Sequence, residues 1–100
     1  MATELNKKEK EIRASLDSLS ELGTMRPGTL SVQYRNPGEK KTPFHQLSYT
    51  HKSKSRSEYV RPESIAAVRD EIRNYKKFRS IVGKITELSL EASRLRHKRQ

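Results

Sequence analysis

The spacing of apolar residues changes twice along this chain, and this change constrains the fold more than any other feature. Toward both ends, apolar residues recur every three or four positions, which is typical of helices with one buried face. Between the ends, apolar residues alternate with polar ones, which is typical of short half-buried strands. The sequence therefore predicts an α+β fold in the order α-β-β-β-α.

The first predicted helix covers residues 1–22. Thr3 suits its start, because a threonine hydroxyl can accept a hydrogen bond from a free N–H of the first turn. Gly23 lies where a glycine often ends a helix. The predicted apolar stripe of this helix is Leu5, Ile12, Leu16, Leu19 and Leu22.

Residues 26–61 are predicted to form a small antiparallel meander. The second and third strands make the most convincing hairpin, joined by the polar loop from His51 to Ser55, whose five-residue length leaves the register open. Tyr49 and Tyr59 would lie near each other across this hairpin. The three strands are expected at residues 29–35, 44–50 and 56–60.

Four aromatic residues of the meander are interleaved with basic residues. Such a mixture can stack single-stranded bases, but aromatic residues on short strands more often form the core beneath a helix. We interpret them as core residues, with base stacking as the alternative. They are Tyr34, Phe44, Tyr49 and Tyr59.

The second predicted helix begins at Pro62, where a missing N–H costs nothing, and runs to residue 99 with a basic tail. Gly83 is the expected point of any bend. The N-terminal helix is expected to pack antiparallel against part of it. The remaining apolar stripe of the long helix then needs the sheet or a second subunit to cover it. We predict this stripe as a partner-helix interface: Ile81, Val82, Ile85, Leu88, Ala92 and Leu95.

Length and composition limit the chain to a single small domain, residues 1–100, with a small core, because only 31% of its residues are hydrophobic. It has no cysteine and its three histidines are scattered, so we expect no disulfide, metal or cofactor. The N-terminus lacks the apolar segment of a secretory signal, and no run is long enough to cross a membrane. We therefore expect a cytoplasmic protein without a membrane partner.

The charge is strongly positive and unevenly distributed. The formal net charge is +10, of which residues 23–61 carry +6 and residues 62–100 carry +5, whereas residues 1–22 carry −1. A charge of this size favours a polyanionic partner. The meander and the C-terminal tail are thus the cationic parts of the chain.

The hairpin loop is the leading candidate for contact with that partner. Cations alternate there with serines, and both groups bind phosphate oxygens, although a solvated loop would look similar. A two-stranded ribbon can also enter a major groove. The predicted nucleic-acid-binding residues are Arg35, Lys40, Lys41, His51, Lys52, Lys54, Arg56, Arg61, Arg94, Arg96, Lys98 and Arg99.

The sequence contains no nucleophile–base constellation, carboxylate pair or phosphate-binding glycine loop, so we expect no enzyme activity. The leading hypothesis is an accessory protein that binds nucleic acid, DNA in preference to RNA, or a nucleoprotein complex. The alternative is a protein–protein interaction module, either a homodimer through the long helix or a small inhibitor of a host nuclease complex.

Three stretches resemble a family of short uncharacterised bacterial and archaeal proteins, often found near transposase genes. They read R-P-G-T-L-S-V-Q-Y at 26–34, F-H-Q-L-S-Y-T-H-K-S-K-S-R-S-E-Y-V-R-P-E at 44–63 and V-R-D-E-I-R-N-Y-K-K-F-R at 68–79. The resemblance implies a prokaryotic mobile element as the origin and implies no activity. Many family members carry a cysteine-rich insert where this chain has N-P-G-E-K-K.

The predicted hairpin and helix are also loosely similar to the three-stranded DNA-binding domains of phage-type integrases. This is an analogy of fold alone, so it implies nothing about which residues bind.

Overall fold

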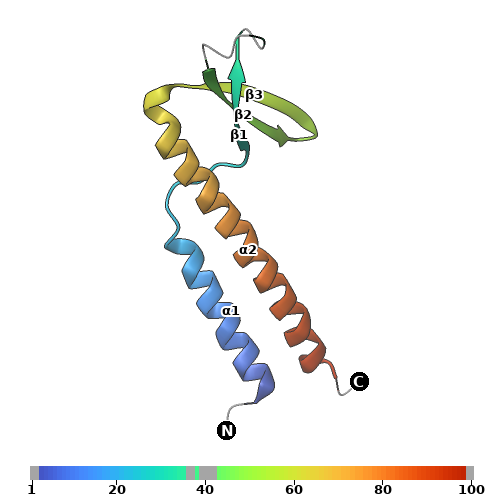
Figure 1. Cartoon of the computed structure of the whole chain (residues 1–100). Coiled ribbons are helices and arrows are strands. Elements are labelled where there is room, and N and C mark those ends of the chain that lie inside the picture. Colours follow the sequence, from blue (N-terminus) through green and yellow to red (C-terminus); the bar gives the residue numbers. More distant parts are fainter. Residues whose placement is uncertain (1–2, 36–37, 39–42, 99–100) are drawn as a thin grey trace. The chain divides into compact units, whose positions relative to one another are not determined.

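The computed structural model describes residues 3–35, 38 and 43–98, and it has the predicted α-β-β-β-α order (Figure 1). The chain divides into two compact units. The helical unit comprises residues 1–23 and 76–100, and the sheet unit comprises residues 24–75. The long helix α2 (Ile65–Arg96) contributes to both units. Within the described residues, no helix is long and apolar enough to cross a membrane.

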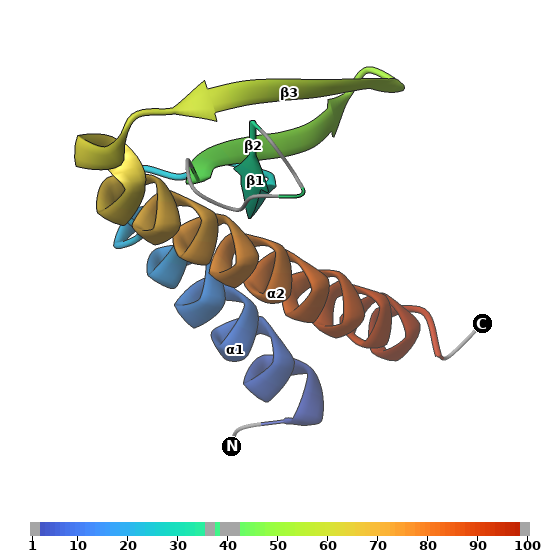
Figure 2. The same cartoon turned by 45° about the horizontal axis from the view of Figure 1, so that its top comes forward.

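The helical unit pairs α1 (Glu4–Ser20) with the later part of α2, and the two helices run antiparallel (Figures 1 and 2). The predicted cap is confirmed, because the Thr3 hydroxyl accepts a hydrogen bond from the Asn6 N–H at 3.1 Å. Two ion pairs join the helices at this end, at N–O distances of 2.6 and 3.3 Å: Lys8 with Glu91, and Arg96 with Glu9.

The inward-facing residues of both helices follow a seven-residue repeat with alternating steps of three and four, the spacing of paired helices. On α2 these residues are Phe78, Ile81, Ile85, Leu88, Ala92 and Leu95, and on α1 they are Leu5, Lys8, Ile12, Ser15 and Leu19, followed by Leu22.

The predicted stripes were wrong at two positions. Leu16 is 51% exposed, and the buried Ser15 faces inward instead. Val82 is 37% exposed, and Ile81 takes the inward position. Neighbouring positions differ by about 100° around the axis, so only one residue of each pair faces inward, and at Ser15 helical periodicity outweighs side-chain polarity.

The predicted partner-helix interface is partly covered within the chain. Leu88 is 7% exposed and Ala92 is fully buried, both in the unit that contains α1. The expectation that these two side chains need the sheet or a second subunit is therefore wrong, since α1 of the same chain supplies the cover.

The sheet unit contains β1 (Thr29–Tyr34), β2 (Pro43–His51) and β3 (Lys54–Val60), antiparallel and in the order β1-β2-β3 (Figure 2). Its core is formed by Leu47 and Val60 of the sheet with Ile72 of α2. The partly buried side chains that pack against this core are Leu30, Tyr49, Ile65 and Val68.

The hairpin between β2 and β3 is much tighter than predicted. Its strands continue to His51 and from Lys54, so the loop is Lys52 and Ser53 alone, with φ angles of 52° and 64°. Two successive positive φ angles are typical of a type I′ turn, whose twist matches that of the strands. The predicted five-residue loop was wrong, because backbone pairing continues through polar residues that give no apolar alternation.

This register also corrects the predicted tyrosine pair. Tyr49 lies opposite Arg56, whereas Tyr59 lies opposite Gln46, so the two tyrosines are on different faces of the sheet. Tyr59 instead contacts Phe44, with ring centroids 6.4 Å apart.

Glycine and proline mark the borders of the elements only in part as predicted. Gly28 has a φ of 140°, and a Cβ there would lie 2.6 Å from Leu47 Cδ1, so this position requires glycine. The expected glycine cap at Gly23 is wrong, because α1 ends with Glu21 in right-handed conformation. Pro62 opens a short 3₁₀ helix, η1 (Pro62–Ser64), which leads into α2, and α2 continues through Gly83 without interruption.

We predict that Leu88→Ala lowers the free energy of unfolding by about 2–5 kcal/mol, because it opens a cavity between the two helices. Leu90→Ala is the matched control, because Leu90 is 52% exposed on the same helix, and its cost should stay below about 1 kcal/mol. Urea unfolding followed by circular dichroism measures both. Equal destabilisation of the two variants would contradict the assigned pairing of the helices.

We also predict that Ser53→Gly stabilises the chain by about 1 kcal/mol, because glycine adopts the left-handed conformation without the strain of a Cβ. Ser57→Gly, inside β3, should instead destabilise it by a similar amount. Thermal unfolding of the two variants gives the comparison. A destabilising Ser53→Gly would contradict the two-residue turn.

Candidate nucleic-acid interface

The strand register sorts the hairpin residues onto two faces. Residues opposite each other in a pair share a face, and successive residues alternate. The face that carries Leu47 and packs against α2 is called here the helix-side face. It continues toward the turn with the opposed pairs Leu47 and Glu58, Tyr49 and Arg56, and His51 and Lys54.

The other side of the sheet, called here the open face, has a different chemistry. Ser55 and Ser57 lie on it, so the structure separates these serines from the cations Lys54 and Arg56 that alternate with them in the sequence. None of its residues is charged and none is buried: they are Thr29, Ser31, Gln33, Phe44, Gln46, Ser48, Thr50, Ser55, Ser57 and Tyr59.

Glu58 is neutralised by a residue that is distant in the sequence. The Arg26 guanidinium donates a hydrogen bond to a Glu58 carboxylate oxygen at 2.6 Å and lies 5.0 Å above the ring of Tyr49. The hydrogen bonds from Arg26 and then from Tyr49 lower the pKa of Glu58 below its usual value. The same hydrogen bond to Glu58 raises the pKa of Tyr49.

Arg26 is held in place by backbone contacts to α2. Its N–H donates to the Glu71 carbonyl at 3.0 Å, and the Asn74 side-chain amide donates to the Thr24 carbonyl at 2.8 Å. The segment that enters β1 is therefore anchored to the helix on both sides of Met25. No local sequence signal marks Arg26 as a partner of Glu58, since the two are 32 residues apart.

The hairpin cations form no ion pair with a described residue, although the charge of Arg56 also helps to lower the pKa of Glu58. Lys52, Lys54 and Arg56 are exposed, and none of the ion pairs between described residues involves them. The only acidic residue of the hairpin strands, Glu58, is already bound by Arg26. The hairpin thus presents three free cations, two on the helix-side face and one in the turn.

The other predicted residues fall into separate groups. Arg35 and Arg61 are exposed and directly follow the last residues of β1 and β3. Of the tail cations, Arg94 and Arg96 lie in the last turn of α2, in the helical unit, and Arg96 is paired with Glu9. Lys98 is exposed beyond the helix, whereas Lys40, Lys41 and Arg99 lie outside the described residues.

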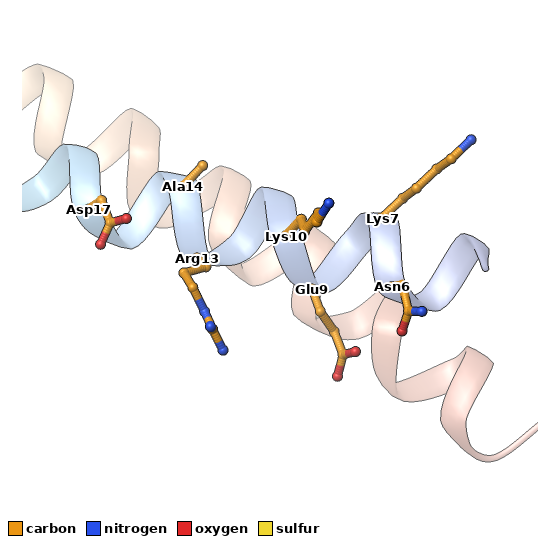
Figure 3. Close-up of a pocket in the computed structure, with 7 residues that line it drawn as sticks. All are labelled: Asn6, Lys7, Glu9, Lys10, Arg13, Ala14 and Asp17. Carbon is orange, nitrogen blue, oxygen red and sulfur yellow. The ribbon is translucent and has the colours of Figure 1, made fainter. Parts of the chain in front are cut away.

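A shallow hollow along α1 offers no comparable site. Its lining comes from α1 alone and every residue is exposed: Asn6, Lys7, Glu9, Lys10, Arg13, Ala14 and Asp17. Figure 3 shows that the side chains do not converge, since Lys7 extends away from Glu9 and Arg13. Among the described residues, no group of three or more histidine, aspartate or glutamate side chains is placed to hold a metal ion.

Comparison with known proteins adds no relative to this picture. No protein-family model matches the chain, and neither a curated protein nor a solved structure is similar to it. The resemblance noted from the three sequence stretches stays a prediction.

We predict that Glu58→Gln lowers stability at neutral pH but not at acid pH. Because the folded pKa of Glu58 lies below its ordinary value of 4.5, the ion pair stabilises the fold above about pH 4.5 and is lost as the pH falls through the lowered pKa. The difference in unfolding midpoint between wild type and variant should therefore shrink below pH 4.5.

Glu87→Gln is the control for this experiment, because Glu87 is exposed and no ion pair between described residues involves it. It should have little effect at either pH. A constant difference between wild type and Glu58→Gln from neutral to acid pH would show that the Arg26–Glu58 pair contributes nothing.

Proposed function

We propose that this protein binds nucleic acid without catalysing a reaction, and that the β2–β3 hairpin supplies the contacts to phosphate. DNA is favoured over RNA, since a two-stranded ribbon fits the major groove of B-DNA, whereas the major groove of an RNA helix is too narrow for side chains. The resemblance noted above adds the context of a prokaryotic mobile element, in which the protein would act as an accessory factor.

The observation that carries this proposal is the placement of the hairpin cations. Lys54 and Arg56 are two residues apart on one strand and share a face, with His51 directly opposite Lys54 and Lys52 in the turn. Residues so spaced lie about 7 Å apart along a strand. A two-residue turn joins the strands that carry them, and Arg26 binds Glu58, the one carboxylate of the hairpin strands, which would otherwise compete with phosphate.

The charge of the whole chain supports the same partner. A net charge of +10 on 100 residues attracts a polyanion over long range and speeds association at low salt. The net charge does not indicate which residues bind the polyanion. The exposed cations of the hairpin are a site at which phosphate could be bound with little rearrangement of side chains.

The double variant Lys54→Gln/Arg56→Gln tests the proposal. We predict weaker binding to a DNA duplex and a salt dependence whose slope falls by about 0.9 for each phosphate that the variant no longer neutralises. Fluorescence anisotropy at several salt concentrations, with a labelled duplex of mixed sequence, gives both quantities.

Lys7→Gln/Lys10→Gln is the matched control, because it removes the same charge from exposed positions on α1, in the other unit. It should change affinity and slope less than the hairpin variant does. Equal effects would show that net charge alone drives binding, and an unchanged affinity of the hairpin variant would refute the hairpin as the site.

A further inference from the structure

The aromatic residues of the open face form a cluster that the hairpin proposal does not use. Tyr59 is 58% exposed, and Phe44 is half-buried beside it, with the ring planes tilted by 47°. Phe44 and Tyr59 lie on the neighbouring strands β2 and β3 and are diagonal neighbours, because Tyr59 lies opposite Gln46, two residues after Phe44. The expectation that these two aromatic residues form the core is wrong, since the core lies on the helix-side face.

Two arginines lie at the same end of the sheet as this aromatic pair. β1 and β3 are both antiparallel to β2, so both end where β2 begins, at Pro43 and Phe44. Arg35 directly follows β1 and Arg61 directly follows β3, and both are exposed. The exposed Tyr59 and the half-buried Phe44 therefore have a guanidinium group beyond each of the two edge strands, and no ion pair between described residues involves either arginine.

The residues next to the aromatic pair are polar but uncharged. Gln33 lies opposite Phe44, and Gln46 lies opposite Tyr59. Side-chain amides both donate and accept hydrogen bonds, as the edges of bases do. The whole open face carries no carboxylate to repel phosphate, and within the described residues none of its side chains is buried.

We propose that the open face binds a single-stranded segment of nucleic acid, with an unpaired base stacked on Tyr59 beside Phe44 and with neighbouring phosphates held by Arg35 and Arg61. Stacking requires an exposed ring face, which a base inside a duplex cannot reach. The guanidinium groups supply the charge that the open face itself lacks. This inference rests on the proposed function and narrows it, because it adds unpaired bases to the phosphate contacts of the hairpin.

The chemistry of this cluster favours single-stranded nucleic acid over a protein partner. A docking surface for a protein is usually a continuous apolar patch, whereas here one aromatic pair is surrounded by hydroxyl and amide groups. Bases combine an aromatic ring with polar edges, and their backbone is anionic. These three properties match the rings, the amides and the arginines of this end of the sheet.

The test compares oligothymidylate of about twelve nucleotides with the same oligomer carrying abasic sites, which has equal length and phosphate number, and with a duplex. Wild-type protein should bind oligothymidylate more tightly than the abasic oligomer. Tyr59→Ala should weaken binding to oligothymidylate about tenfold, since stacking contributes about 1–3 kcal/mol per base. Its affinity for the abasic oligomer and for the duplex should stay unchanged.

Tyr59→Phe keeps the ring and should bind like the wild type, and Ser80→Ala, at an exposed position of α2 in the other unit, should also have no effect. Circular dichroism checks that each variant is folded.

If Tyr59→Ala binds oligothymidylate as tightly as the wild type while Lys54→Gln/Arg56→Gln weakens duplex binding, the hairpin proposal holds and the open-face inference is refuted. Absence of binding to all three probes would refute both. Replacing thymidine by 5-methyluridine adds only the 2′-hydroxyl, and the weakening by Tyr59→Ala should persist if the same site binds.

Discussion

The burial of Leu47 at the centre of the middle strand is the constraint on which the sheet unit depends. Its side chain is fully buried, it lies between Leu30 and Glu58 in the register, and it packs so close to Gly28 that no Cβ fits there. Because side chains alternate along a strand, a slip of one residue would move every side chain of β2 to the opposite face. One buried leucine therefore decides which chemistry each face presents.

The two faces that follow from this register have separate properties. The helix-side face combines the core with the cations of the hairpin, and its one carboxylate is neutralised by Arg26. The open face is free of charge and carries the exposed Tyr59 with the half-buried Phe44 beside it. In the sequence, serines and cations alternate and look like a single mixed loop. The two-residue turn converts this alternation into a cationic face and a hydroxyl-rich face, and it is this separation that makes two distinct contacts with nucleic acid reasonable.

Most of the architecture was predictable from the sequence, because apolar periodicity reports directly on helices and strands. The order of elements and the cap at Thr3 are confirmed, and Pro62 opens the 3₁₀ helix that leads into α2 at Ile65. The details that failed depend on information that is not local. Ser15 faces inward although it is polar, since α1 must present a continuous seven-residue repeat to α2. The tight turn is formed by Lys52 and Ser53, which are not the usual residues of such a turn.

The candidate site was predictable only in part, because it too depends on contacts between residues that are distant in the sequence. The cations of the hairpin are obvious in the sequence, but their division between faces follows only from the register. The Arg26–Glu58 pair joins segments 32 residues apart, and the aromatic pair Phe44–Tyr59 depends on the length of the turn. A five-residue loop would have given a different set of neighbours and would have placed Tyr49 and Tyr59 near each other on one face, as predicted.

The register can be measured directly by nuclear Overhauser spectroscopy of the aromatic side chains. The account predicts cross-peaks between the rings of Phe44 and Tyr59, whose centroids are 6.4 Å apart, and none between Tyr49 and Tyr59, which lie on opposite faces. Strong cross-peaks between Tyr49 and Tyr59, without those between Phe44 and Tyr59, would contradict the register and with it the residues assigned to both proposed binding faces.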